Sequence, residues 1–284
     1  MCDLHGCNTH SNLPPIPLSS ESRRLFIQGL ACLPLATVLF HPELARAAAD
    51  KLETISITLE NGQEASAALA LPEAETAPTV VLIHEWWGLN DQIKAVAAEL
   101  ANLGYIALAV DLYGGESATT AEGAKALMTQ VDKDAATTTL VGWVDWLKNH
   151  ERSTGKVATM GWCFGGGWSL NTSIATPVDA TVIYYGNVKK SAEELKSLSG
   201  PVMGHFGEKD KNINQAMVEG FKEAMDEAGK SESLQVYWYD ADHAFANPTS
   251  ARYDEANAEQ AWERTTAFLA EHLHEQAAAD AEAA

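Results

Sequence analysis

The chain has 284 residues, of which 46% are apolar, and it carries a formal charge of −20 at pH 7. This composition supplies a sizeable packed core and excludes an intrinsically disordered chain. Because Lys and Arg never cluster into a stripe, the acidic balance disfavours binding to nucleic acid or to an anionic membrane surface. No linker interrupts the middle of the chain, so we expect a single domain over 48–284.

The first 47 residues have the order of an export signal. Paired arginines in "SRRLFIQ" are followed by the apolar "GLACLPLATVLF" and by the small-residue stretch "ARAAAD". This order resembles a twin-arginine signal, and we expect cleavage after Ala47, with Ala49 as the alternative point. An uncleaved N-terminal anchor is the competing interpretation, although the apolar segment is shorter than the roughly 20 residues that span a bilayer. We therefore expect a periplasmic protein without stable membrane association.

Strand and helix patterns alternate after the leader. Two short strands around Asn61-Gly62 predict an N-terminal hairpin. Apolar runs then alternate with helical spacing, which predicts a mostly parallel sheet with helices on both faces, an α/β fold. The strand patterns are "TVVLIHE", "YIALAVDLYGG", "KVATMGWC", "ATVIYYGN", "PVMGHFGEKD" and "SLQVYWYDADHAF", and the main helices are expected at 91–104, about 121–131, 135–150, 215–228 and 250–272. The tail from about 275 is expected to fray.

One cysteine has the setting of a nucleophile. Loss of the leader would remove Cys2, Cys7 and Cys32, so that Cys163 has no partner for an intramolecular disulfide. In "GWCFGGG", glycines stand two residues before and two residues after Cys163, the frame of a nucleophile elbow between a strand and a helix. There the helix dipole favours a thiolate. A packed structural cysteine is the alternative that this frame disfavours.

Other reactive side chains also follow strands directly, namely Glu85, Asp210 and His243. Because such residues gather at the carboxyl edge of a parallel sheet, we expect them to meet Cys163. The order nucleophile, acid, histidine is that of the α/β-hydrolase fold. His243 would be the general base and Asp210 would orient it, since Asp240 and Asp242 are too close to the histidine in sequence to reach its ring correctly.

The oxyanion of an acyl-transfer reaction would need backbone N–H donors. We expect these from Phe164, which follows the nucleophile, and from Trp86 in the loop after the first long strand.

Two further histidines are not expected at the site. His205 lies inside an apolar strand and is expected to be a core residue, and His84 should point to the opposite face from Glu85.

These motifs together resemble the dienelactone hydrolase family of α/β-hydrolases. The likeness covers about 55–272 and rests on "HEWWGLND", "GYIALAVDLYGG", "MGWCFGGG", "YYG", "HFGEKD" and "DADHAFAN" in the family's order. It implies hydrolysis of a lactone or ester, of the carboxymethylenebutenolidase type, through a thiol acyl-enzyme and without a metal or organic cofactor. Glu85 matches the family glutamate that contacts the resting thiol and helps to generate the thiolate.

The chain departs from the family at two positions. The arginines expected to grip a substrate carboxylate are replaced by Gly114 or Gly115 and by Asn247. A carboxylate clamp is therefore absent from these positions. Aromatic residues near the strand ends point instead to a neutral, apolar or aromatic ester or lactone, and the candidate substrate-binding residues are Trp87, Tyr113, Trp162 and Tyr184.

Two other functions remain open at the level of sequence. One is a non-catalytic exported protein that binds a small molecule in a hydrolase fold. The other is a redox role of the lone thiol, which would need a partner thiol from another molecule. No HExxH motif, cysteine pair or aspartate-rich loop indicates a metal site.

Overall fold

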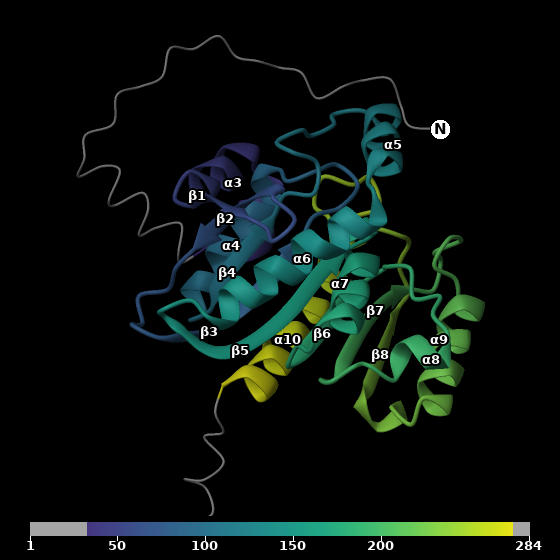
Figure 1. The fold of residues 1–284 in the computed structure, drawn as a ribbon. Helices are drawn as coiled ribbons and strands as arrows, with labels where there is room; N and C mark the ends of the chain where they lie inside the picture. The colour runs from purple at the N-terminus through teal and green to yellow at the C-terminus, as the bar shows by residue number, and fades with distance from the viewer. Residues whose placement is uncertain (1–32, 275–284) are drawn as a thin grey trace, which may run out of the picture.

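An eight-stranded sheet forms the centre of the protein, in the order β1-β2-β4-β3-β5-β6-β7-β8 (Figure 1). The computed structural model describes residues 33–274. From β4 through β3 to the edge strand β8, each strand is parallel to its neighbour, and β2 is antiparallel to both of its neighbours, β1 and β4. The mostly parallel α/β sheet is therefore confirmed. The strands are β1 Glu53–Thr58, β2 Glu64–Ala70, β3 Ala77–Ile83, β4 Ile106–Val110, β5 Ser153–Trp162, β6 Ala180–Tyr184, β7 Val202–Gly207 and β8 Leu234–Tyr239.

Helices cover both faces of this sheet. Those whose buried side chains pack on one face are α2 (Leu35–Phe40), α3 (Pro42–Ala49), α4 (Asp91–Asn102) and α10 (Glu255–Leu273). The opposite face is covered by α6 (Lys133–Lys148), α7 (Phe164–Ala175), α8 (Ala192–Leu195) and α9 (Gln215–Glu227). The short α5 (Ala121–Gln130) buries Ala124.

The continuous apolar run of β3 follows from this two-sided cover. Val80 and Leu82 pack into the core on the α4 side, whereas Val81 and Ile83 pack on the α6 side. All four are fully buried. A strand with helices on both faces cannot show the alternation of a half-exposed strand, because the side chains of both faces leave water.

The two N-terminal strands pair around a tight turn. Thr58 lies opposite Glu64, and the N–H of Leu59 donates to the carbonyl of Gln63 at 2.8 Å. At the turn Gly62 has a φ of +80°. Glycine is favoured there because a side chain strains the left-handed region.

Most helix boundaries lie near their predicted positions, but the last helix begins five residues later than predicted. Asp254 is its N-cap and accepts a hydrogen bond from the N–H of Asn257 at 3.1 Å. Before it, Asn247 accepts from the N–H of Thr249, and Ser250 accepts from the N–H of Arg252. These side-chain bonds to the backbone satisfy the loop as turns, and the helix therefore starts only after Asp254.

The end of the predicted leader lies on the domain. Helices α2 and α3 pack beside α4, with Ala45, Ala48 and Ala49 buried (Figure 1). The predicted cleavage point after Ala47 therefore lies inside a helix, and cleavage requires α3 to leave α4 first. Among the described residues no helix is long and apolar enough to cross a membrane. The arginine pair, Cys2, Cys7, Cys32 and the tail from 275 lie outside the described residues.

Candidate functional site

A strained backbone raises Cys163 between β5 and α7. Its φ is 54° and its ψ is −113°, a conformation that a residue with a side chain rarely adopts. A Cβ on Gly161 would lie 2.1 Å from the carbonyl oxygen of Gly165, and a Cβ on Gly165 would lie 2.1 Å from that of Ile83. Both glycines are thus required by close backbone approach, as in a nucleophile elbow.

Cys163, His243 and Asp210 form one continuous hydrogen-bonded chain. The Nε2 of His243 lies 3.2 Å from the Sγ of Cys163, and its Nδ1 lies 2.6 Å from the Oδ2 of Asp210. The Asp210 side chain is fully buried, and that of His243 is 13% exposed. The other oxygen of Asp210 accepts from the N–H groups of Asn212 and Ile213 at 2.8 and 3.0 Å, which fixes the carboxylate.

The two charged partners stabilise each other. Burial by itself would lower the pKa of His243, but the bond to Asp210 and the contact with Cys163 outweigh it and raise that pKa to about 10. Burial would likewise raise the pKa of Asp210, but the hydrogen bonds from His243 and from the two N–H groups keep it below its usual value. The site therefore favours an imidazolium beside an ionised carboxylate.

The other nearby aspartates do not reach the ring. Asp242 accepts from the backbone N–H of His243 at 2.7 Å, and Asp240 pairs with Lys209 at 2.8 Å. Their places agree with the choice of Asp210 as the orienting residue.

The two expected oxyanion donors lie at the same end of the sheet as Cys163. Phe164 is the first residue of α7, and Trp86 lies three residues after β3. Within the described chain, neither backbone N–H donates a hydrogen bond, so both are available to a ligand. The hydroxyl of Tyr113 donates to the carbonyl of Trp86 at 3.2 Å and positions that loop.

Glu85 is buried, with 6% of its surface exposed. Its carboxylate accepts hydrogen bonds from the Tyr185 hydroxyl, at 3.4 Å, and from the Asn247 amide. Burial raises the pKa of Glu85 above its usual value, although these two donors oppose the shift. Among the described residues, the hydrogen-bond partner of the Cys163 thiol is His243, and Glu85 makes no hydrogen bond to it.

The predicted aromatic residues divide into two groups. Tyr113 packs against Phe164 with ring centroids 5.7 Å apart, and Trp86 packs against Trp87 at 5.0 Å. The hydrogen bond from the Tyr113 hydroxyl to the Trp86 carbonyl connects the two pairs. Trp86, Trp87 and Phe164 are partly exposed, and Tyr113 is buried.

The structure does not bring Trp162 and Tyr184 into this group. Their rings pack on each other at 5.5 Å, and both line a cavity next to α10 that the triad residues do not line. The Tyr184 hydroxyl bonds to Thr265 at 2.7 Å. Because successive residues of a strand point to opposite faces, Trp162 points away from Cys163 although the two are adjacent in sequence.

Two site residues were missed by sequence reasoning. Tyr185 has a φ of 37°, its ring lies 5.1 Å from that of His243, and its hydroxyl reaches Glu85. Asn247 was considered only as the replacement of an arginine, yet its amide binds Glu85. The signal for Tyr185 was the strand period, since the residue one place beyond Tyr184 faces the other side of the sheet.

Two histidines occupy the places expected of them. His205 is buried, with Nδ1 2.8 Å from the Tyr239 hydroxyl and Nε2 3.0 Å from that of Thr265. His84 is buried and accepts from the N–H of Leu112 at 3.2 Å. Within 33–274, no group of three or more His, Cys, Asp or Glu side chains is arranged to hold a metal ion.

Comparison with known proteins identifies related chains. The model of the dienelactone hydrolase family matches residues 65–273. A carboxymethylenebutenolidase from Pseudomonas putida is 30% identical over 233 residues, which cover 77% of this chain and 96% of the relative. Carboxymethylenebutenolidase 1 from Cupriavidus pinatubonensis is 26% identical, covering 76% and 95%. A crystal structure of a dienelactone hydrolase-like promiscuous phosphotriesterase from metagenomic libraries has a TM-score of 0.71 at 22% identity, covering 78% and 99%.

Proposed function

This chain belongs to the dienelactone hydrolase family and is an ester or lactone hydrolase, and we propose that it acts through the Cys163 thiol with His243 and Asp210. The observation that carries the proposal is the unbroken contact from Sγ through the imidazole to the carboxylate, at 3.2 and 2.6 Å. A nucleophile, a base and a group that orients the base are the parts that acyl transfer requires.

In the first half-reaction the Cys163 sulfur attacks the carbonyl carbon of the substrate. The thiol proton resides on His243 Nε2, which the raised pKa of the imidazole favours. A C–S bond forms, the C–O bond of the ester breaks, and the leaving oxygen takes the proton from Nε2. With a lactone the ring opens, so the new hydroxyl stays on the acyl group bound to the enzyme.

In the second half-reaction a water molecule attacks the thioester. Nε2 of His243 takes the proton of the water, a C–O bond forms, and the C–S bond breaks to return the sulfur as a thiolate. Asp210 keeps the imidazole in the orientation that serves both steps. The negative charge on the carbonyl oxygen would be held by the N–H groups of Phe164 and Trp86.

Glu85 has a separate role in this proposal. Its carboxylate lies at the carboxyl end of β3, next to the ring of Tyr185 that packs on His243. A raised pKa favours the protonated, neutral form of Glu85, and a neutral Glu85 adds no second negative charge to the site when the thiol proton passes to His243. We infer that Glu85 buffers the charge of the site when Cys163 ionises.

We propose a neutral, apolar or aromatic ester or lactone as the substrate class. Trp86, Trp87, Tyr113 and Phe164 offer aromatic surface beside the donors. Asn247 does not provide a carboxylate clamp, because its amide is uncharged and already donates a hydrogen bond to Glu85. A clear kinetic preference for anionic lactones over matched neutral ones would contradict this choice.

We also propose that the protein is exported by a twin-arginine signal to the periplasm and loses residues 1–47. The order of paired arginines, apolar segment and small residues supports this proposal. N-terminal sequencing of the exported protein tests it: we expect a mature chain that begins at Ala48, or at Asp50 if cleavage follows Ala49, and an N-terminus before Ala48 would contradict the proposal.

The test of the proposed mechanism is hydrolysis of a short activated aryl ester under reducing conditions. We expect the wild-type protein to be active and Cys163→Ala to lose at least about a thousandfold of kcat, because the nucleophile is gone. Mass spectrometry of the quenched reaction should show the acyl group on Cys163. Equal activity of the two proteins would contradict a thiol mechanism.

A further inference from the structure

The buried imidazole of His84 is not part of the triad, yet it contacts both residues that carry the oxyanion donors. His84 follows β3 directly and is fully buried. Its ring stacks on that of Phe164, with centroids 5.9 Å apart and an angle of 20° between the planes. Its Nδ1 lies 2.6 Å from the carbonyl oxygen of Glu85, which belongs to the same peptide unit as the N–H of Trp86. The proton transfers of the triad leave these contacts unexplained.

The hydrogen bonds of His84 determine which ring nitrogen carries the proton. The backbone N–H of Leu112 donates to Nε2 at 3.2 Å, so Nε2 is the acceptor. A carbonyl oxygen can only accept, so Nδ1 must donate to Glu85. Burial lowers the pKa of His84, which keeps the ring neutral with a single N–H. The imidazole is therefore an Nδ1–H donor that is anchored by the loop after β4.

The carbonyl of Glu85 is held by two donors. It accepts from Nδ1 of His84 at 2.6 Å and from the N–H of Gly88 at 3.2 Å. No peptide bond within 33–274 is cis, so this carbonyl and the N–H of Trp86 point in opposite directions from one rigid plane. Rotation of the plane would break both hydrogen bonds. The bond from His84 therefore fixes the direction of the Trp86 N–H, which has no acceptor within the described chain.

We propose that His84 is a positioning residue, which in its Nδ1–H form holds the Glu85–Trp86 peptide so that the Trp86 N–H faces the oxyanion of the reacting carbonyl. This inference rests on the proposed thiol mechanism and names the group that orients one of its donors. A donor that is oriented in advance stabilises the charge that develops in the transition state. Loss of this orientation therefore lowers kcat and leaves KM nearly unchanged.

Two substitutions at His84 separate the roles of its two nitrogens. The amide of His84→Asn can place an N–H donor where Nδ1 lies, whereas that of His84→Gln can place an oxygen acceptor where Nε2 lies. Both variants lose the ring that stacks on Phe164, so their difference isolates the bond to Glu85. For the aryl ester we expect kcat of His84→Asn within about threefold of the wild type and kcat of His84→Gln at least about thirtyfold lower, since loss of a whole oxyanion donor costs about a hundredfold to a thousandfold.

The order of the two variants decides the outcome. Equal kcat values of His84→Asn and His84→Gln, the reverse order, or an effect on KM alone would overturn the positioning role. If Cys163→Ala is inactive while the two His84 variants match each other, the thiol mechanism stands and only the positioning role fails. If the wild type and Cys163→Ala hydrolyse the ester equally, the mechanism fails and the positioning role fails with it.

Alkylation of Cys163 by iodoacetamide reports on the thiol without using the oxyanion donors. The sulfur displaces iodide from a saturated carbon, so no oxyanion forms. We expect the alkylation rate of His84→Gln to stay within about threefold of the wild type, because the thiol keeps its contact with His243. A fall as large as that in kcat would mean a general disturbance of the thiol and would overturn the proposal.

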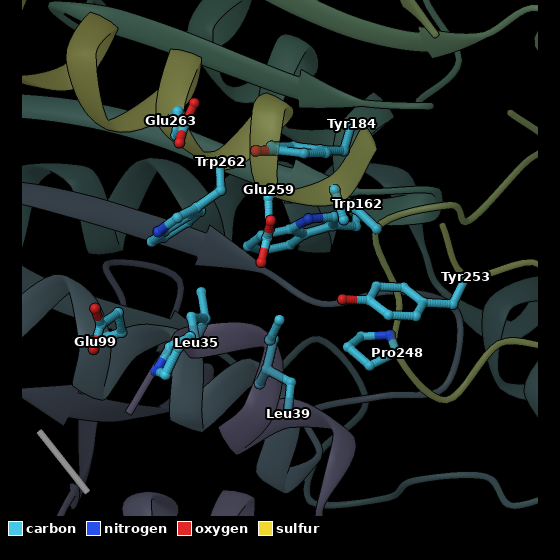
Figure 2. Close-up of a pocket in the computed structure, with 14 residues that line it drawn as sticks. Leu35, Leu39, Glu99, Trp162, Tyr184, Pro248, Tyr253, Glu259, Trp262 and Glu263 are labelled. Atoms are coloured by element: carbon cyan, nitrogen blue, oxygen red, sulfur yellow. The ribbon is translucent and has the colours of Figure 1, made fainter. Parts of the chain in front are cut away.

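The matched control is His205→Gln, which removes another buried neutral imidazole. His205 packs on Tyr184, which lines the cavity next to α10 shown in Figure 2, and the triad residues do not line this cavity. We expect its kcat to stay within about threefold of the wild type, because the site is distant from the oxyanion donors. An equal loss of kcat in His205→Gln and His84→Gln would mean that loss of any buried histidine slows the reaction, and would overturn the proposal.

The protonated nitrogen of His84 can also be observed directly. Nitrogen NMR of isotope-labelled full chain distinguishes the two neutral forms of an imidazole from each other and from the imidazolium. The signals of His84 are those that disappear in His84→Asn. We expect a proton on Nδ1 and none on Nε2 at neutral pH. A proton on Nε2, alone or together with one on Nδ1, would overturn the proposal.

Discussion

The orienting role of Asp210 can be separated from the presence of a nearby negative charge. Asp210→Asn removes the acceptor from Nδ1 of His243, lowers the pKa of the ring and leaves it free to take the wrong tautomer. We expect kcat/KM for an aryl ester to fall at least about a hundredfold. Asp242→Asn removes the same charge one residue from His243 and should change kcat/KM less than about threefold. Both rates are measured in steady-state assays.

Equal loss of activity by Asp210→Asn and Asp242→Asn would contradict the role of Asp210 as the residue that orients His243. Circular dichroism of both proteins checks that each is folded. In Asp210→Asn the amide oxygen of the new side chain can still accept from the N–H groups of Asn212 and Ile213, so we expect the loop itself to keep its shape.

At the scale of the secondary-structure elements, the junction of β5 and α7 depends on Gly165. A Cβ at this position would lie 2.1 Å from the carbonyl oxygen of Ile83 on β3, so Gly165→Ala must push α7 away from the sheet. We expect it to lower the free energy of unfolding by about 1–3 kcal/mol or more and to abolish ester hydrolysis, since Cys163 moves with the helix. Urea unfolding and the aryl-ester assay measure the two effects.

The control for this variant is Gly220→Ala on α9. A Cβ at Gly220 meets no atom within 4 Å, and alanine is the better helix former. This variant should raise the free energy of unfolding by about 0.5–1 kcal/mol and leave activity unchanged. If Gly165→Ala behaves like Gly220→Ala, the close approach at the elbow is not a constraint.

The contact between β7, β8 and α10 makes stability depend on pH. His205 of β7 is buried and neutral between Tyr239 and Thr265. Burial, aided by the positive charge of Arg264, lowers its pKa to about 3. The unfolded chain binds a proton near pH 6.5 and the folded chain does not, so this stabilisation is present above pH 6.5 and is lost as the pH falls toward 3.

We therefore expect a contrast between the wild type and His205→Gln. The free energy of unfolding of the wild type should fall by up to about 1.4 kcal/mol per pH unit more steeply than that of His205→Gln between pH 6 and 4. Because the other titrating groups are shared, they cancel in the difference. Parallel profiles from urea unfolding at each pH would show that His205 titrates normally in the folded protein.

How much of this molecule the sequence predicts depends on the range of the contacts. Periodicity predicts β3 and α4, because neighbours along the chain determine their pattern. The glycine frame predicts the elbow at Cys163 for the same local reason. The bonds of Glu85 to Tyr185 and Asn247 join residues 100 and 162 positions apart in sequence, and no local pattern encodes which side chain fills that space. The sequence predicted Tyr184 at the site, but Tyr185 is the residue beside His243, so this prediction was wrong by one position along the chain.

At the scale of the whole molecule, the segment with the features of a leader also contributes to the core. Val38 and Leu39 of α2 and Ala45 of α3 are buried in the same cluster as Ile93 and Val96 of α4. The segment thus covers one face of α4. A chain that begins at residue 50 would expose this face to water.

We expect that removal of residues 1–49 lowers the melting temperature by at least about 4 °C compared with a chain that begins at residue 33. The reason is that two large side chains, Val38 and Leu39, each contribute about 1.5–3 kcal/mol through burial, and about 1 kcal/mol corresponds to 2–4 °C in a domain of this size. Binding of the dye 8-anilinonaphthalene-1-sulfonate should rise in the shorter chain, because α4 becomes accessible. Ester hydrolysis should be retained, since none of the triad residues lies in α2 or α3. Equal melting temperatures and equal dye binding would mean that α2 and α3 are not part of the stable fold in solution.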